Sequence, residues 1–152
     1  MIDFSVIVAG FGGQGILSGG KFVATAALLE NREVSWFPSY GPEMRGGTAN
    51  CSVVISDEPI GSPVINAADV LIVMNGPSLD RFISHVKPGG LVIMDSSLVL
   101  NVPARRDVRG QREPRKAVAG QEALAREVAV AVEVGLLPGP GLGEQPELRL
   151  RL

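Results

Sequence analysis

The chain has 152 residues, which is the length of one domain and enough to bury a hydrophobic core. A net charge of −2 and a pI near 5.4 argue against nucleic acid or an anionic membrane as a partner. Its single cysteine, Cys51, excludes an internal disulfide. No apolar run reaches the roughly eighteen residues of a membrane span, and the first residues lack the pattern of a signal peptide. We therefore expect a cytoplasmic protein.

Apolar strands and helical periods alternate along the first hundred residues. The run DFSVIVAG predicts a buried strand, and apolar residues at helical spacing follow it over 15–30. A second strand is expected from Arg32 and should end at Pro38. Further strands are predicted over 49–56, 68–75 and 89–97, with a helix over 78–86. This alternation predicts a three-layer α/β/α domain with a mostly parallel, Rossmann-like sheet.

Composition changes sharply near Asn101. All the aromatic residues lie before it, whereas nine of the 14 Lys and Arg residues lie after it. We therefore expect an α/β core over residues 1–102 and an Arg-, Pro- and Gly-rich tail over 103–152. One helix is predicted in this tail, at about 119–134. The stretch NVPARRDVRGQREPRKAVAG predicts no strand.

The sequence GFGGQG follows the first predicted strand. Glycines between a strand and a helix allow a tight turn, and free N–H groups at the helix start attract an anion. A dinucleotide site would also need an acidic residue after the second strand, but the nearest acids, Glu30 and Glu33, precede that strand. Close packing of strand and helix is the structural alternative. The candidate binding residues in this turn are Gly10, Gly12, Gly13, Gln14 and Gly15.

Three stretches in a fixed order carry a family resemblance: GFGGQGILSGGKFVATAALLE, SYGPEMRGGTANCSVVISDEPIGSP and ADVLIVMNGPSLDRF. Together they resemble the gamma subunit of the 2-oxoacid:ferredoxin oxidoreductases, the pyruvate/ketoisovalerate oxidoreductase catalytic domain family. The resemblance covers about residues 3–100. Its central loop is more similar to the 2-oxoglutarate and branched-chain members than to the pyruvate members.

The resemblance implies a reaction that a complex performs. A 2-oxoacid, with 2-oxoglutarate favoured, is decarboxylated on thiamine diphosphate, electrons pass through iron–sulfur clusters to ferredoxin, and coenzyme A takes the acyl group. The implied partners are alpha and beta subunits, the latter binding thiamine diphosphate, a ferredoxin-like delta subunit, and ferredoxin. One cysteine cannot hold a cluster, so we expect this chain to bind no such cofactor alone and to be inactive alone.

The loop SYGPEMRGGT would then face the active centre or a partner. Arg45 offers a planar fork of donors for a phosphate or carboxylate, and Glu43 would hold it in place. Gly46 and Gly47 would let the loop lie close to a ligand, and Tyr40 would supply apolar contact. The alternative without a functional role is an exposed Glu43–Arg45 ion pair, which would contribute less than about 1 kcal/mol to stability.

A polar turn after the fourth predicted strand supplies a last candidate, Asn75, at the strand end where open α/β sheets bind ligands. Ser78 is a candidate helix cap, and Asp95 ends a later strand in the same way. Cys51 is expected to be a small buried residue, and His85 to have a surface or capping role. Two competing interpretations remain: a stand-alone Rossmann-like nucleotide-binding module, or a remnant unable to assemble.

Overall fold

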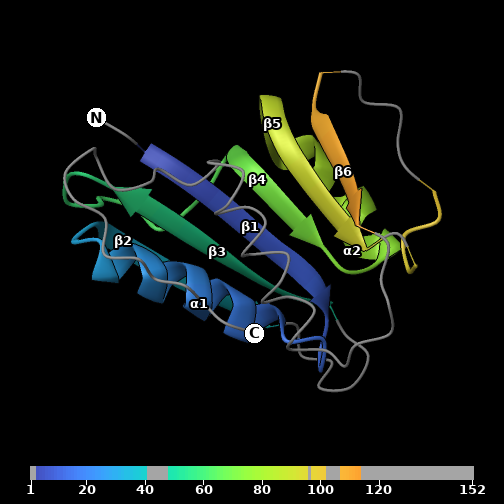
Figure 1. Ribbon diagram of the computed structural model, residues 1–152, viewed down its shortest axis with the longest axis horizontal. Coiled ribbons are helices and arrows are strands. Elements are labelled where there is room, and N and C mark those ends of the chain that lie inside the picture. The colour runs from blue at the N-terminus through green and yellow to red at the C-terminus, as the bar shows by residue number, and fades with distance from the viewer. Residues whose placement is uncertain (1–2, 41–47, 96, 102–106, 114–152) are drawn as a thin grey trace.

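A six-stranded mixed sheet forms the centre of the computed structural model, which describes residues 3–40, 48–95, 97–101 and 107–113 (Figure 1). The strands follow one another in space in the order β2-β3-β1-β4-β5-β6. Their bounds are β1 Asp3–Phe11, β2 Glu33–Tyr40, β3 Thr48–Ser56, β4 Ala68–Val73, β5 Val86–Asp95 and β6 Arg109–Glu113. The helices are α1 Ile16–Leu29 and α2 Gly76–Phe82, and a 3-10 turn, Ile83–His85, continues α2.

Five strands run in one direction and β3 runs against them. β1, β4, β5 and β6 pair in parallel, whereas β3 is antiparallel to both of its neighbours, β1 and β2. The connection from β2 to β3 spans only residues 41–47, and a short connection joins antiparallel neighbours because a parallel pair needs a longer crossover. The expected mostly parallel sheet is therefore confirmed, with one opposed strand near its edge.

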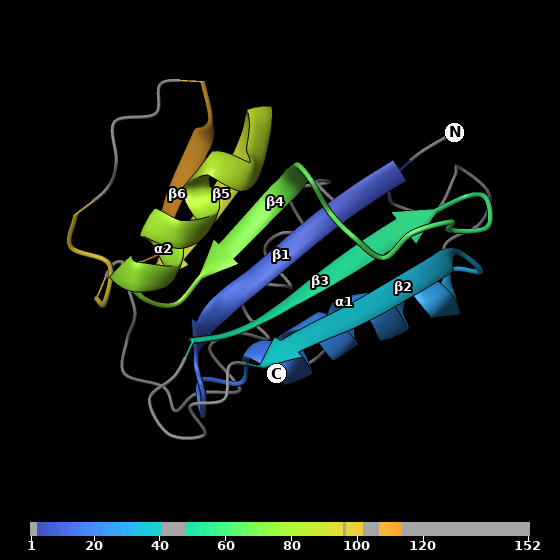
Figure 2. The same cartoon turned by 180° about the vertical axis from the view of Figure 1, so that it is seen from behind.

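Helices cover both faces of the sheet, as the predicted three-layer fold requires (Figures 1 and 2). Successive residues of β1 alternate between two cores. Val6 and Val8 pack in the cluster under α1, whereas Ile7 and Ala9 pack in the cluster under α2. The continuous apolar run at the start of the chain is thus explained by burial on both faces.

Helix α1 lies very close to β3 at Gly20. A Cβ on Gly20 would lie 2.9 Å from Trp36 Nε1 and would also clash with the sulfur of Cys51. Cys51 is fully buried, and its Sγ lies 3.5 Å from the Ile16 carbonyl. Burial raises the pKa of the Cys51 thiol to about 11. The prediction of a small buried cysteine is confirmed.

Two sequence predictions about strands are wrong. Pro38 does not end β2, which continues to Tyr40 with Pro38 paired opposite Cys51. β2 lies at the margin of the sheet, where a residue without an N–H is tolerated. The stretch after Asn101 does contain a strand, β6, which pairs in parallel with β5. Its sequence, RGQRE, has no apolar pattern. A strand at the end of the sheet can pair through its backbone alone, so it needs no such pattern.

The remaining predictions about the tail lie outside the described residues. These are the helix at about 119–134 and most of the segment 103–152, so the boundary at residue 102 stays a prediction. Within the described part of the chain, no helix is long and apolar enough to cross a membrane.

Candidate functional site

The turn between β1 and α1 leaves backbone open at the carboxyl edge of the sheet. Gly13 and Gly15 have φ angles of 89° and 79°, which side chains rarely adopt. No described atom lies within 4 Å of where a Cβ on Gly12 or Gly13 would lie. Helix α1 begins with no side-chain cap and no acidic residue in its first turn. This geometry suits the approach of an anionic group to backbone N–H donors.

Gln14 fixes the shape of this turn. Its Oε1 accepts a hydrogen bond from the Phe11 N–H at 2.7 Å, and its Nε2 donates to the Met74 carbonyl at 3.3 Å. A Cβ on Gly10 would lie 2.7 Å from the same Oε1 and 2.6 Å from Ile16 Cδ1. The side chain of Gln14 therefore joins the glycine turn to the end of β4, and Gly10 leaves the room that this contact needs.

Asn75 holds the neighbouring turn, between β4 and α2. Its Oδ1 caps α2 by accepting from the Ser78 N–H at 2.8 Å, and its Nδ2 lies 3.5 Å from Gln14 Oε1. Asn75, and not Ser78, is therefore the cap of this helix. Asn75 is buried, so its side chain supports the turn from the interior of the protein.

The ends of β2 and β3 reach the same edge as the glycine turn. Ala49 of β3 pairs with Tyr40 on one side and with Gly10 on the other. The loop predicted to face the active centre therefore starts and ends beside the glycine turn. Of Tyr40 the structure describes only the backbone, and Glu43, Arg45, Gly46 and Gly47 lie outside the described residues.

Arg81 is a residue at this edge that sequence reasoning did not select. Its Nη1 donates to Thr48 Oγ1 at 3.4 Å, so a side chain from the last turn of α2 reaches the start of β3. The contact is exposed, and no ion pair of Arg81 is found among the described residues. Only the folded topology brings Arg81 and Thr48 together, because they are 33 positions apart.

The sheet order also bears on the dinucleotide interpretation. In a dinucleotide-binding domain the second strand lies beside the first, so that its end reaches the ribose. Here β3 lies between β1 and β2. The end of β2 is therefore one strand farther from the glycine turn, in addition to lacking the acidic residue.

Two other polar residues are engaged locally. Asp95, at the end of β5, accepts from both the backbone N–H and the hydroxyl of Ser97, at 2.9 and 2.6 Å. His85 lies on the surface, with its Nδ1 3.3 Å from Ser84 Oγ. Among the described residues, no group of His, Cys, Asp and Glu side chains could hold a metal ion. The described part of the site can therefore bind and position a ligand through backbone N–H groups and polar side chains.

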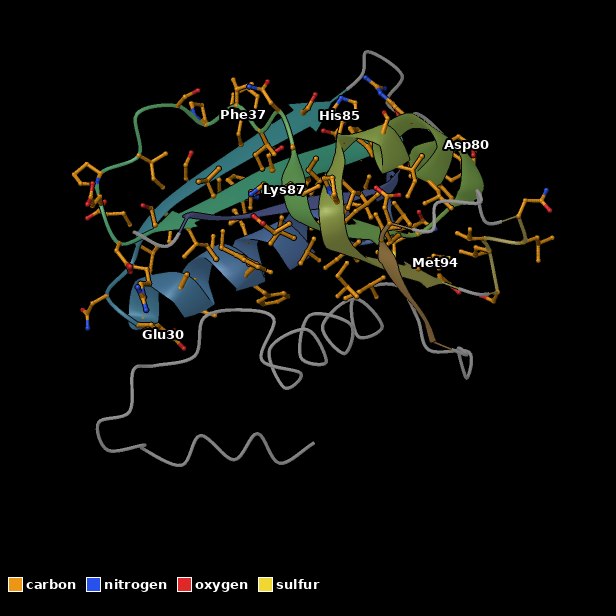
Figure 3. The ribbon with its side chains drawn as sticks, turned by 90° about the horizontal axis from the view of Figure 1, so that it is seen from above. Glu30, Phe37, Asp80, His85, Lys87 and Met94 are labelled. Atoms are coloured by element: carbon orange, nitrogen blue, oxygen red, sulfur yellow. The ribbon has the colours of Figure 1, made fainter. Side chains whose placement is uncertain are left out.

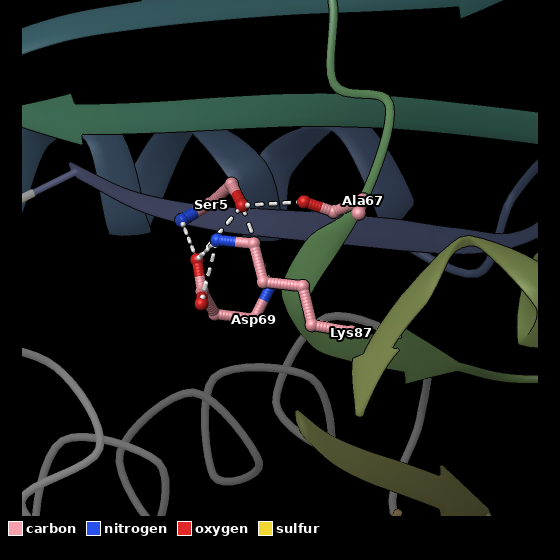
Figure 4. A network of polar contacts seen from close by, with 4 residues as sticks. All are labelled: Ser5, Ala67, Asp69 and Lys87. Carbon is pink, nitrogen blue, oxygen red and sulfur yellow. Dashed lines mark hydrogen bonds and ion pairs between the residues drawn. The ribbon is translucent and has the colours of Figure 1, made fainter. Parts of the chain in front are cut away.

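The opposite, amino edge of the sheet is tied together by charge (Figure 4). Asp69 Oδ2 accepts from the backbone N–H and the hydroxyl of Ser5, both at 2.9 Å, and Lys87 Nζ lies 2.9 Å from both Asp69 oxygens. Arg32 and Asp57 form a second ion pair at this edge. A cavity of about 520 Å³ opens beside these residues, between β3 and the segment that leads to β4.

Comparison with known proteins identifies the family. A family model described as pyruvate ferredoxin/flavodoxin oxidoreductase matches residues 5–137. The chain belongs to this family. The match continues beyond the residues 3–100 for which sequence patterns predicted the resemblance, and it includes β6.

Two curated relatives show different relations to the length of this chain. The ketoisovalerate oxidoreductase subunit VorA of Methanothermobacter thermautotrophicus is 44% identical over 140 residues, which are 92% of this chain but only 29% of VorA. The 2-oxoglutarate synthase subunit KorC of Methanocaldococcus jannaschii is 38% identical over 132 residues, 86% of this chain and 71% of KorC. This chain thus spans under a third of VorA and most of KorC.

Two solved structures share the fold. The gamma subunit of a keto/oxoacid ferredoxin oxidoreductase from Geobacter sulfurreducens superposes with a TM-score of 0.65 at 28% identity, covering 74% of this chain and 61% of that one. The 2-oxoglutarate:ferredoxin oxidoreductase of Magnetococcus marinus gives 0.67 at 29%, covering 75% of this chain and 20% of that one. The latter structure contains 2-oxoglutarate, coenzyme A and succinyl-CoA.

Proposed function

We propose that this chain is the gamma subunit of a 2-oxoacid:ferredoxin oxidoreductase, which oxidatively decarboxylates a 2-oxoacid to an acyl-CoA and reduces ferredoxin. The family match over residues 5–137 carries the proposal. KorC supports it further, because this chain covers 71% of that subunit. The role of this subunit would be to bind and position a ligand, since its described site offers backbone donors, two neutral amides and the side chain of Arg81.

The carboxyl edge is the part of the chain that would serve the active centre. Open backbone at Gly12 and Gly13, beside an uncapped start of α1, fits a phosphate group of coenzyme A. Coenzyme A supplies the thiol that takes the acyl group. Arg45 and Arg81 would add positive charge at this edge, one from the loop and one from α2. Asn75 and Gln14 would hold the two turns in fixed positions relative to each other.

The other groups of the reaction would belong to partner subunits. Thiamine diphosphate would be held by the beta subunit, which acts with the alpha subunit, and iron–sulfur clusters by subunits with several cysteines, including a ferredoxin-like delta subunit. Ferredoxin would be the electron acceptor. We place the complex in the cytoplasm, where such clusters and a reduced Cys51 are stable.

The 2-oxoacid itself is either 2-oxoglutarate or a branched-chain acid. Sequence patterns favour 2-oxoglutarate, and KorC belongs to a 2-oxoglutarate synthase. VorA, a subunit of a ketoisovalerate oxidoreductase, is more similar in sequence. Because subunits of both kinds of enzyme resemble this chain, the choice of 2-oxoacid would be made by another subunit of the complex.

Reconstitution tests this function. The chain is combined with its alpha, beta and delta subunits, and viologen reduction is measured with 2-oxoglutarate or ketoisovalerate in the presence of coenzyme A. We expect activity from the complete set, none from this chain alone, and a large loss when this chain is omitted. Full activity without the chain would refute the proposal, and so would activity of the isolated chain.

A further inference from the structure

Four apolar side chains of β4 and β5 are buried on the side of the sheet that carries α1. They are Val70 and Ile72 of β4 and Leu91 and Ile93 of β5, and they belong to the same hydrophobic cluster as the residues beneath α1. Ile72 is 1% exposed and Ile93 is 0% exposed. Side chains stand out from the face of a sheet, so burial this complete requires a second layer that packs over them. We call these four residues the β4–β5 patch.

The described helices and loops do not account for this burial. Helix α1 packs on β1, β2 and β3, and α2 lies on the other side of the sheet, as Glu30 of α1 and Asp80 of α2 show (Figure 3). The described connections also belong to the other side. Ile65, before β4, and Val99 and Val108, between β5 and β6, pack in the cluster under α2. The second layer over the β4–β5 patch therefore comes from another part of the chain.

One segment outside the described ranges is long enough to form this layer. The structure contains a single chain, so the layer cannot come from a second molecule. Segments 1–2, 41–47, 96 and 102–106 are too short to cover two strands. Residues 114–152, in contrast, follow β6 directly, and β6 lies beside β5.

The helix expected over 119–134 has the amphipathic pattern that such a layer needs. At the helical period, one of its sides is apolar and the opposite side is mostly charged. The apolar side has Leu124, Val128, Ala131 and Val132, and the opposite side has Glu122, Arg126, Ala129 and Glu133. The family match extends to residue 137, so it includes the whole of this segment.

We propose that residues 119–134 form an amphipathic helix that packs on the β4–β5 patch through Leu124, Val128 and Val132. Apolar side chains would then meet apolar side chains, while the charged side of the helix faces solvent. This helix would complete the layer that α1 begins, and the folded domain would extend at least to residue 134. The proposal depends on burial and sequence pattern and not on the proposed function.

Two neighbouring substitutions in the full chain test the orientation of this helix. Val128→Asp puts a carboxylate on the apolar side, whereas the control Ala129→Asp puts the same group on the charged side. The control also loses more helix propensity, because alanine is the better helix former. We expect Val128→Asp to shift the unfolding equilibrium in urea at least about tenfold toward the unfolded state, because a buried carboxylate has lost its water. Ala129→Asp should shift it much less, and equal shifts would overturn the proposal.

Nuclear Overhauser effects between methyl groups of the wild-type chain test where the helix lies. We expect contacts from the methyl groups of Leu124, Val128 or Val132 to those of Ile72, Leu91 or Ile93. Their absence would overturn the proposal, and so would contacts from this segment to the apolar residues under α2 instead.

Discussion

The two edges of the sheet are built from different chemistry. At the amino edge, charged side chains pair with one another, Lys87 with Asp69 and Arg32 with Asp57. At the carboxyl edge, the glycine turn and the turn after β4 are held by two neutral amides, Gln14 and Asn75. Since these charges are already paired within the chain, the amino edge offers little to an ionic ligand. The carboxyl edge, in contrast, keeps its turns fixed while the backbone at Gly12 and Gly13 stays open.

The largest effect should come from filling the space that the carboxyl edge needs for its own packing. In Gly10→Ala the new Cβ would meet Ile16 Cδ1 at 2.6 Å, Gln14 Oε1 at 2.7 Å and Met74 Cβ at 3.0 Å. Overpacking of this kind costs about 1–3 kcal/mol. We expect urea unfolding to show this loss. An unchanged midpoint would mean that the turn is looser than the contacts of Gly10 indicate.

A somewhat smaller loss is expected when the amide that joins the two turns is removed. Gln14→Leu leaves the Phe11 N–H and the Met74 carbonyl without their partner, which costs about 1–2 kcal/mol. Gln14→Glu keeps an acceptor for Phe11 but turns a carboxylate oxygen toward the Met74 carbonyl, so it should also be destabilising at neutral pH. Wild-type stability of Gln14→Leu in urea unfolding would contradict the double role of Gln14.

The amino edge should respond through stability alone. Asp69→Ala removes the acceptor of the Ser5 N–H and hydroxyl and should cost about 1 kcal/mol. Lys87→Met should cost less, because the lysine side chain is 42% exposed and the ion pair is screened by solvent. In the reconstituted enzyme, both variants should retain the wild-type affinity for coenzyme A. A weakened affinity in either would erase the distinction between the two edges.

The fold could be predicted from the sequence because its strands and helices bury apolar residues on both faces of the sheet. The apolar runs of β1, β4 and β5 and the helical spacing of α1 depend on side-chain periodicity, which a sequence displays directly. Predictions failed where a strand joins the sheet by its backbone. β6 has polar residues, and β2 passes through Pro38 because a marginal strand need not donate there.

The candidate site was predictable in part, for a related reason. The glycine turn and Asn75 follow strand ends, so their common edge could be inferred from local sequence. The contact of Arg81 with Thr48 and the network around Asp69 join residues that are far apart in the chain. Such contacts depend on strand order. The position of β3 between β1 and β2 cannot be read from the sequences of these strands.

The central claim is that the open backbone of the carboxyl edge receives coenzyme A, and Gly12→Val tests it most directly. The new side chain would enter space free of described atoms, and φ at Gly12 is not positive, so folding should be unaffected. The measurement is the dissociation constant of coenzyme A for the reconstituted enzyme, with Gly12→Ala as the smaller step and Lys87→Met as the control. We predict at least about a tenfold increase for Gly12→Val, equivalent to about 1.4 kcal/mol, a smaller increase for Gly12→Ala, and none for Lys87→Met. A wild-type dissociation constant for Gly12→Val would contradict the account.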